Sequence, residues 1–223
     1  MFILSNIVDK LVEEYIRELL PENQGILKEL EEFAEENNVP IIHPEVAKFL
    51  DVIIKTSRIS SILEVGTAIG YSALVFSKAM DDKGRIVTIE KREDMHKIAF
   101  ENIKKAGLES NIQVLLGDAV DVFPQINGKF DMIFLDAAKG HYQKFLLSCI
   151  EKLNDNGIIV SDNVLYKGMV ASNEYLIRRK ITIVKRMRKY LKYISDHPEL
   201  TTSIIPIGDG VALTYKSGRN FSE

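Results

Sequence analysis

The spacing of apolar residues along the chain changes near residue 60. Before that point, as in ILKELEEFAEENN (26–38), apolar residues recur every three or four positions, which predicts amphipathic helices. Beyond it, short β-branched runs such as RIVTIE (85–90) alternate with helical stretches such as REDMHKIAFENIKKAG (92–107). Strands that alternate with helices predict βαβ units, a parallel sheet and helices on both of its faces.

The last two apolar runs follow a different rule. TTSIIPIG and GVALTYK are joined through Gly208, Asp209 and Gly210, a tight link that predicts an antiparallel pair. We therefore expect an α/β fold with a Rossmann-like, seven-stranded, mostly parallel sheet, helices on both faces and an antiparallel C-terminal strand pair. As domains we expect a helical N-terminal extension over residues 1–57 and one α/β unit over residues 58–223.

Composition narrows the class of protein. Apolar residues make up 46% and charged residues 27% of the 223, the balance of a soluble globular protein. Cys149 is the one cysteine, so an intrachain disulfide is excluded and a reducing compartment is indicated. The segment MFILSNIVDKLVEEY lacks the basic start of a signal peptide, and no apolar run approaches the ~18 residues of a membrane span. We therefore expect a cytoplasmic protein.

The end of the first predicted strand, ILEVGTAIGYS, indicates a nucleotide-like cofactor. Gly66 and Gly70 are four residues apart, unlike a dinucleotide fingerprint, and Glu64 would repel a pyrophosphate but suits an ammonium group. Glu90, at the end of the next strand, can accept hydrogen bonds from two ribose hydroxyls. Asp118 ends the third strand, where it could accept from an adenine amino group. Together these residues favour S-adenosylmethionine over NAD, although each acid taken singly is more often a helix cap or a solvated side chain than a ligand.

The fourth and fifth predicted strands each end on an acid. Asp136 follows DMIFL and Asp162 follows GIIVS, with Asn163 next to it. If the two strands are neighbours, these oxygens converge into a set that suits Mg²⁺ better than zinc. Such a metal would activate one of two adjacent substrate hydroxyls for O-methylation, and Lys139 could take the proton. The competing interpretations are helix capping for the ligand set and a surface ion pair for Lys139.

These segments carry a family resemblance. ILEVGTAIGYS, VTIEK, LLGDA, FLDAAKGHY and VSDNVLYKG resemble the cation-dependent class I O-methyltransferases of the catechol and caffeoyl-CoA type. The resemblance implies Asp136, Asp162 and Asn163 as metal ligands and Lys139 near the transferred proton. It also implies a homodimer and a set of cofactor-binding positions: Ile42, Ser72, Glu90, Ala119, Asp118 and Asp136. His43 has no implied role and is expected to be a surface histidine before a helix.

The C-terminal third carries a narrower resemblance and a block of positive charge. DNVLYKGMV, DHPEL and IIPIGDGVAL resemble bacterial tRNA 5-hydroxyuridine methyltransferases, which implies the wobble base of a tRNA anticodon loop as substrate. Residues 178–192 hold eight basic residues and no acid. They predict either a solvated amphipathic helix or a phosphate-binding surface. The candidate RNA-binding residues are Arg178, Arg179, Lys180, Lys185 and Arg188.

Three functions remain open at this point. The first is methylation of 5-hydroxyuridine to 5-methoxyuridine in tRNA, where Tyr142 or Tyr166 could stack on the base unless they belong to the core. The second is a small-molecule O-methyltransferase acting on catechols or caffeoyl-CoA. The third is an RNA-binding protein that kept the fold without the chemistry, against which the intact set of Asp136, Asp162, Asn163 and Lys139 argues.

Overall fold

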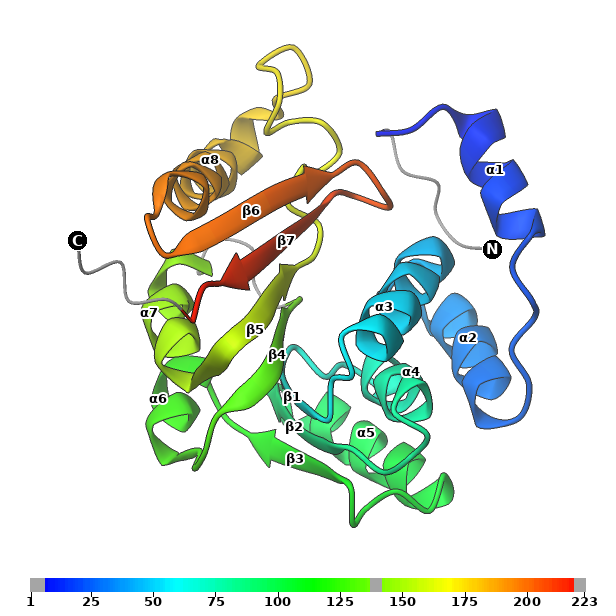
Figure 1. The fold of residues 1–223 in the computed structure, drawn as a ribbon. Helices are drawn as coiled ribbons and strands as arrows, with labels where there is room; N and C mark the ends of the chain where they lie inside the picture. Colours follow the sequence, from blue (N-terminus) through cyan, green and yellow to red (C-terminus); the bar gives the residue numbers. More distant parts are fainter. Residues whose placement is uncertain (1–6, 137–141, 219–223) are drawn as a thin grey trace.

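A seven-stranded sheet forms the centre of the molecule (Figure 1). The computed structural model describes residues 7–136 and 142–218. The strand order is β3-β2-β1-β4-β5-β7-β6. The strands are β1 (Ser61–Val65), β2 (Arg85–Glu90), β3 (Ile112–Leu116), β4 (Phe130–Leu135), β5 (Leu153–Ser161), β6 (Leu200–Ile205) and β7 (Val211–Lys216).

Strand direction agrees with the sequence prediction. β1 to β5 pair in parallel, whereas β7 pairs antiparallel with both β5 and β6. The expected Rossmann-like fold with an antiparallel C-terminal pair is therefore confirmed. The order reverses between β1 and β4, and the crevice beyond the carboxyl ends at such a switch point is where open α/β sheets bind ligands.

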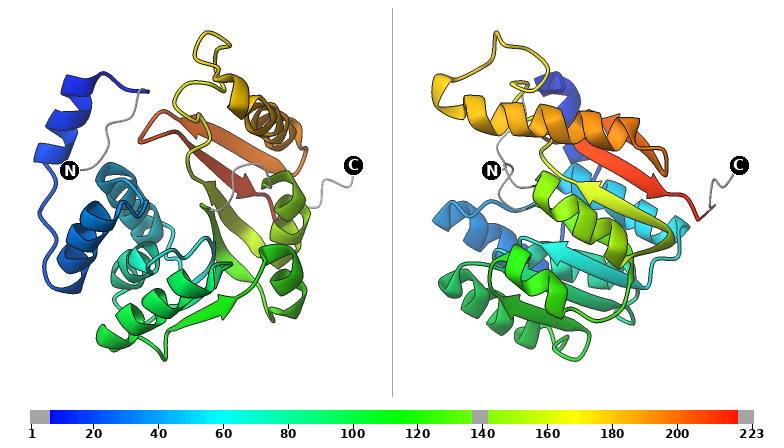
Figure 2. Two further views of the ribbon diagram at one scale, coloured as in Figure 1. Left: turned by 180° about the vertical axis from the view of Figure 1, so that it is seen from behind. Right: turned by 90° about the vertical axis from the view of Figure 1, so that its left-hand side faces the viewer.

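Helices cover both faces of the sheet (Figure 2). One face carries α2 to α5 and the other carries α6 to α8. The helices are α1 (Lys10–Glu18), α2 (Ile26–Asn37), α3 (Pro44–Thr56), α4 (Tyr71–Ala79), α5 (Glu93–Lys105), α6 (Ala119–Val122), α7 (Tyr142–Lys152) and α8 (Ile181–Asp196). Single 3₁₀ turns lie at Phe123–Gln125 and Arg178–Lys180.

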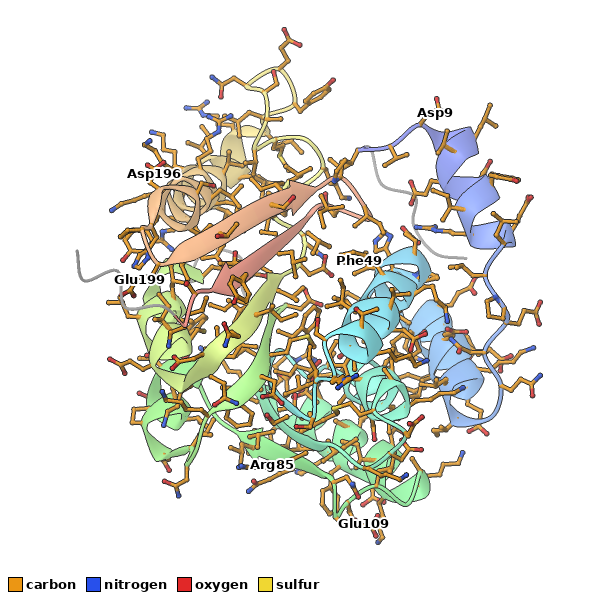
Figure 3. The ribbon with its side chains drawn as sticks, viewed as in Figure 1. Asp9, Phe49, Arg85, Glu109, Asp196 and Glu199 are labelled. Carbon is orange, nitrogen blue, oxygen red and sulfur yellow. The ribbon has the colours of Figure 1, made fainter. Side chains whose placement is uncertain are left out.

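Residues of the central strands contribute to two separate cores, one on each face, and side chains fill the space on both sides of the sheet (Figure 3). In β1, Ile62 packs with α2 to α5, whereas Leu63 and Val65 pack with α6 to α8. Because central strands are buried on both faces, they read as nearly continuous apolar runs in the sequence. A polar residue at a strand end therefore stands out as a candidate for function.

Helix α1 is attached to the rest of the molecule through charge. Arg17 pairs with Glu13 of its own helix (2.5 Å) and with Glu45 of α3 (2.8 Å), and both acids are buried. A guanidinium nitrogen of Arg17 also lies 2.8 Å from Nδ1 of His43, which must accept because a guanidinium has no lone pair to offer. The guanidinium thus fills the space between the two acids and the histidine. The expectation of a surface histidine is wrong, because His43 is only 20% exposed and belongs to this cluster.

The length and apolar character of the helices decide whether any of them could cross a membrane. Among residues 7–136 and 142–218, no helix combines the length and the apolar character that a bilayer crossing requires.

Replacing Arg17 with methionine should destabilise the protein by about 3 kcal/mol, because two buried carboxylates would lose their counter-ion. Urea denaturation, followed by circular dichroism, measures the free energy of unfolding. Lys10→Met is the matched control on the same helix, since within the described residues Lys10 makes an exposed ion pair with Glu14 at 3.6 Å. A loss no larger than that of the control would contradict a stabilising role for the cluster.

Candidate active site

Four strand-end residues form one row across the carboxyl edge of the sheet. The backbone ladder continues one residue beyond the strands: the N–H groups of Gly66, Asp136 and Asp162 donate to β2, β1 and β4 respectively, each at 3.0 Å. With the register of the paired strands, this places Glu90, Gly66, Asp136 and Asp162 in that order, about 4.8 Å apart. The strands that end next to Asp136 and Asp162, β4 and β5, are therefore neighbours, as the predicted metal site requires.

The carboxylate of Glu90 organises the loop that follows β1. It accepts the backbone N–H of Ala68 at 2.9 Å and that of Arg92 at 2.8 Å, and it is 8% exposed. Ala68 has a positive φ of 46°, a conformation that these bonds help to hold. Each carboxylate oxygen has a second lone pair, so Glu90 can still accept hydroxyl groups of a bound nucleoside.

Glu64 lies beneath this loop and is fully buried. Its two oxygens accept from the hydroxyls of Ser72 and Thr88, and Thr88 is also within 2.5 Å of the hydroxyl of Thr67. Burial, with a contribution from the charge of Glu90, raises the pKa of Glu64 to about 7 against the partly opposing effect of the two hydroxyls. Glu64 thus links β1, β2 and the start of α4. Ser72, a predicted cofactor-binding residue, donates a hydrogen bond from its hydroxyl to Glu64.

Two of the remaining predicted cofactor residues, Asp118 and Ala119, follow the carboxyl end of β3. Asp118 caps α6 by accepting from the backbone N–H of Val120 (3.1 Å) and pairs with Lys91 (2.7 Å). Ala119 is the first residue of α6 and Ile42 precedes α3, and both are buried. The capping interpretation therefore holds for Asp118, and its contact with an adenine group stays a prediction.

The predicted metal ligands lie at the β4–β5 side of the row. Asp162 is 1% exposed, and its Oδ1 accepts the backbone N–H of Asn163 at 2.6 Å. Asp136 is partly buried beside it. Asn163 has a left-handed backbone with φ of 58°, which asparagine tolerates better than most residues. Two carboxylates and one amide thus gather at one corner of the sheet, and Lys139 lies outside the described residues.

Tyr142 connects the ends of β4 and β5 at this corner. Its hydroxyl lies 3.0 Å from the carbonyl of Leu135 and 3.1 Å from that of Asp162, which share its single proton, and the side chain is 1% exposed. Burial, followed by the charges of Asp136 and Asp162, raises the pKa of Tyr142 well above its ordinary value. Tyr142 therefore belongs to the core and holds two strand ends together, which excludes stacking on a substrate base. The sequence offers only a weak signal for this role: a tyrosine shortly after the strand-end acid.

The basic segment divides into residues with different surroundings. Arg188 donates to the carbonyls of Val170 (2.8 Å) and Met169 (3.1 Å) and to the Asn173 side chain (2.9 Å), so its guanidinium fastens the loop before α8. Lys180 lies over the ring of Tyr166, 5.6 Å from its centre. A further set of predicted RNA-binding residues is exposed: Arg178, Arg179 and Lys185.

A family comparison agrees with this arrangement. The family model described as O-methyltransferase matches residues 17–217. The chain belongs to the O-methyltransferase family.

Individual relatives cover most of the chain. Catechol O-methyltransferase of Niastella koreensis is 34% identical over 173 residues, which span 75% of this chain and 78% of that protein. Caffeoyl-CoA O-methyltransferase 2 of Populus trichocarpa is 28% identical over 221 residues, with 90% and 86% covered.

Solved structures match over nearly the whole chain. A Staphylococcus aureus structure, provisionally named a caffeoyl-CoA O-methyltransferase, has a TM-score of 0.87 at 33% identity and covers 93% of this chain and 100% of that one. An O-methyltransferase from Bacillus cereus in complex with SAH (S-adenosylhomocysteine) has a TM-score of 0.82 at 26% identity, with 93% and 97% covered.

This O-methyltransferase is thus an enzyme that depends on S-adenosylmethionine and belongs to a cation-dependent family. The roles of the individual site residues stay predictions, supported by their shared edge of the sheet. The homodimer also stays a prediction, since the structure contains a single chain.

Glu64→Gln should change how the stability of the cofactor-free enzyme depends on pH. The folded protein keeps the Glu64 proton up to about pH 7, whereas an unfolded glutamate loses it near its ordinary value of 4.5. Between these values the folded state binds more protons, so the parent loses stability as pH rises, by about 3 kcal/mol relative to the glutamine variant.

Thermal and urea unfolding of parent and variant at pH 4, 6 and 8 would measure this difference. Glu109→Gln, at an exposed position, controls for the loss of one carboxyl group. A parent-minus-variant difference that stays constant from pH 4 to pH 8 would show that folding leaves the pKa of Glu64 at its ordinary value, which would contradict the upward shift.

Proposed function

We propose that this enzyme methylates one of two adjacent oxygens on its substrate in a reaction assisted by a hard divalent cation such as Mg²⁺. The observation that carries the proposal is the row of strand ends, in which Asp136 and Asp162 occupy neighbouring ladder positions. Gly66 and Glu90, on the cofactor side, continue the same row. The methyl donor and the cation would therefore lie side by side.

The residues present fit a hard cation. Asp136, Asp162 and Asn163 offer oxygen atoms alone, the donors that Mg²⁺ prefers. A second group of possible metal ligands consists of Glu13, His43 and Glu45. There, however, the guanidinium of Arg17 forms ion pairs with both acids. The strand-end corner is therefore the better candidate for a cation site.

The chain's own groups would then orient both reactants. Glu90 would accept hydrogen bonds from the ribose hydroxyls. Glu64 would act on the ammonium end of the cofactor indirectly, by supporting the loop that follows β1. S-adenosylmethionine supplies an electrophilic methyl group, and a bound cation supplies the Lewis acidity that lowers the pKa of a neighbouring hydroxyl. Tyr142 would keep Asp136 and Asp162 in place. Lys139 stays the predicted acceptor of the proton.

For the substrate, a small catechol-type molecule is the first candidate. The named relatives are catechol and caffeoyl-CoA O-methyltransferases, whose names indicate small-molecule substrates. A catechol offers the two adjacent oxygens that the proposed chemistry needs. Because a catechol is small, it would need no binding surface beyond the corner of Asp136, Asp162 and Asn163.

A second candidate substrate is the 5-hydroxyuridine of a tRNA anticodon loop, whose 5-hydroxyl and O4 are also adjacent. One observation favours it. The segment that follows Asn163 leads to the exposed side chains of Tyr175, Arg178 and Arg179 before α8 begins. An exposed aromatic ring beside exposed arginines is the combination that single-stranded RNA uses for stacking and phosphate contacts.

Asp162→Ala should reduce methyl transfer at least 100-fold while leaving the affinity for S-adenosylmethionine within threefold, because the residue is assigned to the cation and not to the cofactor. Calorimetric titration gives the affinity, and turnover of a catechol gives the rate. Glu90→Ala is the comparison, since it should lose cofactor affinity. A cofactor loss in Asp162→Ala as large as in Glu90→Ala would overturn the metal assignment. Full turnover of the parent in chelator, with metal absence verified, would overturn it as well.

A triple reversal at Arg178, Arg179 and Lys185 to glutamate should separate the two substrates. Lys180 and Arg188 stay unchanged because both contact the loop that carries Asn163. If RNA is the substrate, methylation of tRNA should fall at least tenfold, and the salt dependence of tRNA binding should flatten by about 0.7–0.9 in log–log slope per lost phosphate contact. Catechol turnover should stay near the parent rate.

The matched control reverses three exposed lysines in or next to α4 and α5, on the opposite face of the sheet from α8: Lys78, Lys83 and Lys104. Steady-state kinetics on both substrates would be compared after circular dichroism confirms folding. Unchanged activity on tRNA, or no activity on tRNA in the parent, would leave the small-molecule substrate as the function. Equal losses on both substrates would assign the segment a structural role.

A further inference from the structure

The loop that carries Asn163 has an unusual backbone. Asn163, Tyr166 and Lys167 all have positive φ values, of 58°, 46° and 56°. Bulky residues such as tyrosine and lysine avoid this region, so the conformation persists only where the surroundings determine it. Strained backbone of this kind gathers at functional sites, which directs attention to the groups that hold the loop.

The turn between β6 and β7 supplies those groups. The carbonyl of Asp209 accepts the N–H of Leu165 at 3.0 Å, and the carbonyl of Gly210 accepts the N–H of Val164 at 2.9 Å. The carboxylate of Asp209 accepts the N–H of Lys167 and is 8% exposed. Three backbone N–H groups within four residues of Asn163 are therefore bound by two residues of one turn.

The same turn is closely packed on both sides. A Cβ added to Gly210 would lie 2.4 Å from the side chain of Leu165, and one added to Gly208 would lie 2.7 Å from Val46 of α3. Both glycines have positive φ values, of 87° and 53°. The turn thus lies in close contact with the Asn163 loop on one side and with the start of α3 on the other.

We propose that Asp209 is a positioning residue that fixes Asn163 for cation binding. This inference rests on the proposed function, because Asn163 is taken as a cation ligand. The carboxylate anchors the backbone two residues after Leu165, and the two carbonyls anchor Val164 and Leu165. With both ends of this stretch bound, Asn163 would keep its left-handed backbone conformation next to Asp162 at the corner of the sheet.

Partners that orient metal ligands typically contribute 10–100-fold to metal affinity. Asp209→Ala should therefore weaken Mg²⁺ binding at least tenfold, raise the Mg²⁺ concentration needed for half-maximal rate, and leave the rate at saturating Mg²⁺ within about threefold of the parent. Affinity for S-adenosylmethionine should not change. Asp209→Asn should recover most of the Mg²⁺ affinity, because an amide oxygen still accepts from the Lys167 N–H.

Hydrogen exchange supplies a readout that needs no metal and no turnover. In Asp209→Ala the amide of Lys167 should exchange at least tenfold faster than in the parent, while amides in β1 and β4 keep their protection. Thr202→Val is the matched control on the same hairpin. It removes the hydrogen bonds of the Thr202 hydroxyl to Thr214 (3.0 Å) and to the carbonyl of Ile194 (2.9 Å), neither of which involves the Asn163 loop.

Calorimetry or Mn²⁺ spectroscopy would be run on parent, Asp209→Ala, Asp209→Asn, Thr202→Val and Asp162→Ala. Loss of Mg²⁺ affinity in Asp209→Ala and Asp162→Ala, but not in Thr202→Val, supports the inference. Unchanged affinity in Asp209→Ala beside a loss in Asp162→Ala overturns the inference alone. Unchanged affinity in Asp162→Ala overturns the proposed metal site and this inference with it. If Asp209→Ala does not fold, Asp209→Glu displaces the carboxylate while keeping its charge and takes the same measurements.

Discussion

The backbone ladder that extends one residue past β1, β4 and β5, beside the last residue of β2, is the constraint on which the site depends. Parallel strands buried on both faces hold their spacing at about 4.8 Å because every central backbone group must be paired. The register then decides which residues stand next to one another at the carboxyl edge. Gly66, Glu90, Asp136 and Asp162 are brought together by main-chain hydrogen bonds, so their neighbourhood does not rely on any contact between their side chains.

Side chains behind this edge give the row its finer geometry. Glu64 with Ser72 and Thr88, and Tyr142 with two strand-end carbonyls, are buried polar groups with hydrogen-bond partners. A buried polar group that loses its partner costs more free energy than one bond contributes, so these networks favour a single arrangement. They resist the displacement of Glu90 or Asp162 that an apolar core alone would tolerate.

The sequence predicted what depends on local pattern and left out what depends on tertiary contact. Strand ends could be located because an acid after an apolar run, as at Asp136 and Asp162, interrupts a pattern visible in a few residues. The roles of Arg17, Tyr142 and Arg188 could not be read this way, since each has a partner 18 or more residues away in the sequence: Glu45, Asp162 and Val170 respectively. A charged residue in a sequence carries no mark that distinguishes a solvated side chain from a buried counter-ion.

Arg188 shows what this means for the substrate. The eight basic residues looked like one surface, yet the guanidinium of Arg188 is occupied by carbonyls of the loop that begins at Asn163, and Lys180 lies over Tyr166 of that loop. Helix α8 and the β6–β7 turn therefore hold the same loop from two sides. An RNA bound to the exposed arginines before α8 would contact the segment that also carries Asn163. The loop between Asn163 and α8 would then serve both the recognition of a large substrate and the geometry of the proposed cation site. A small catechol would contact only the end of this loop that carries Asn163.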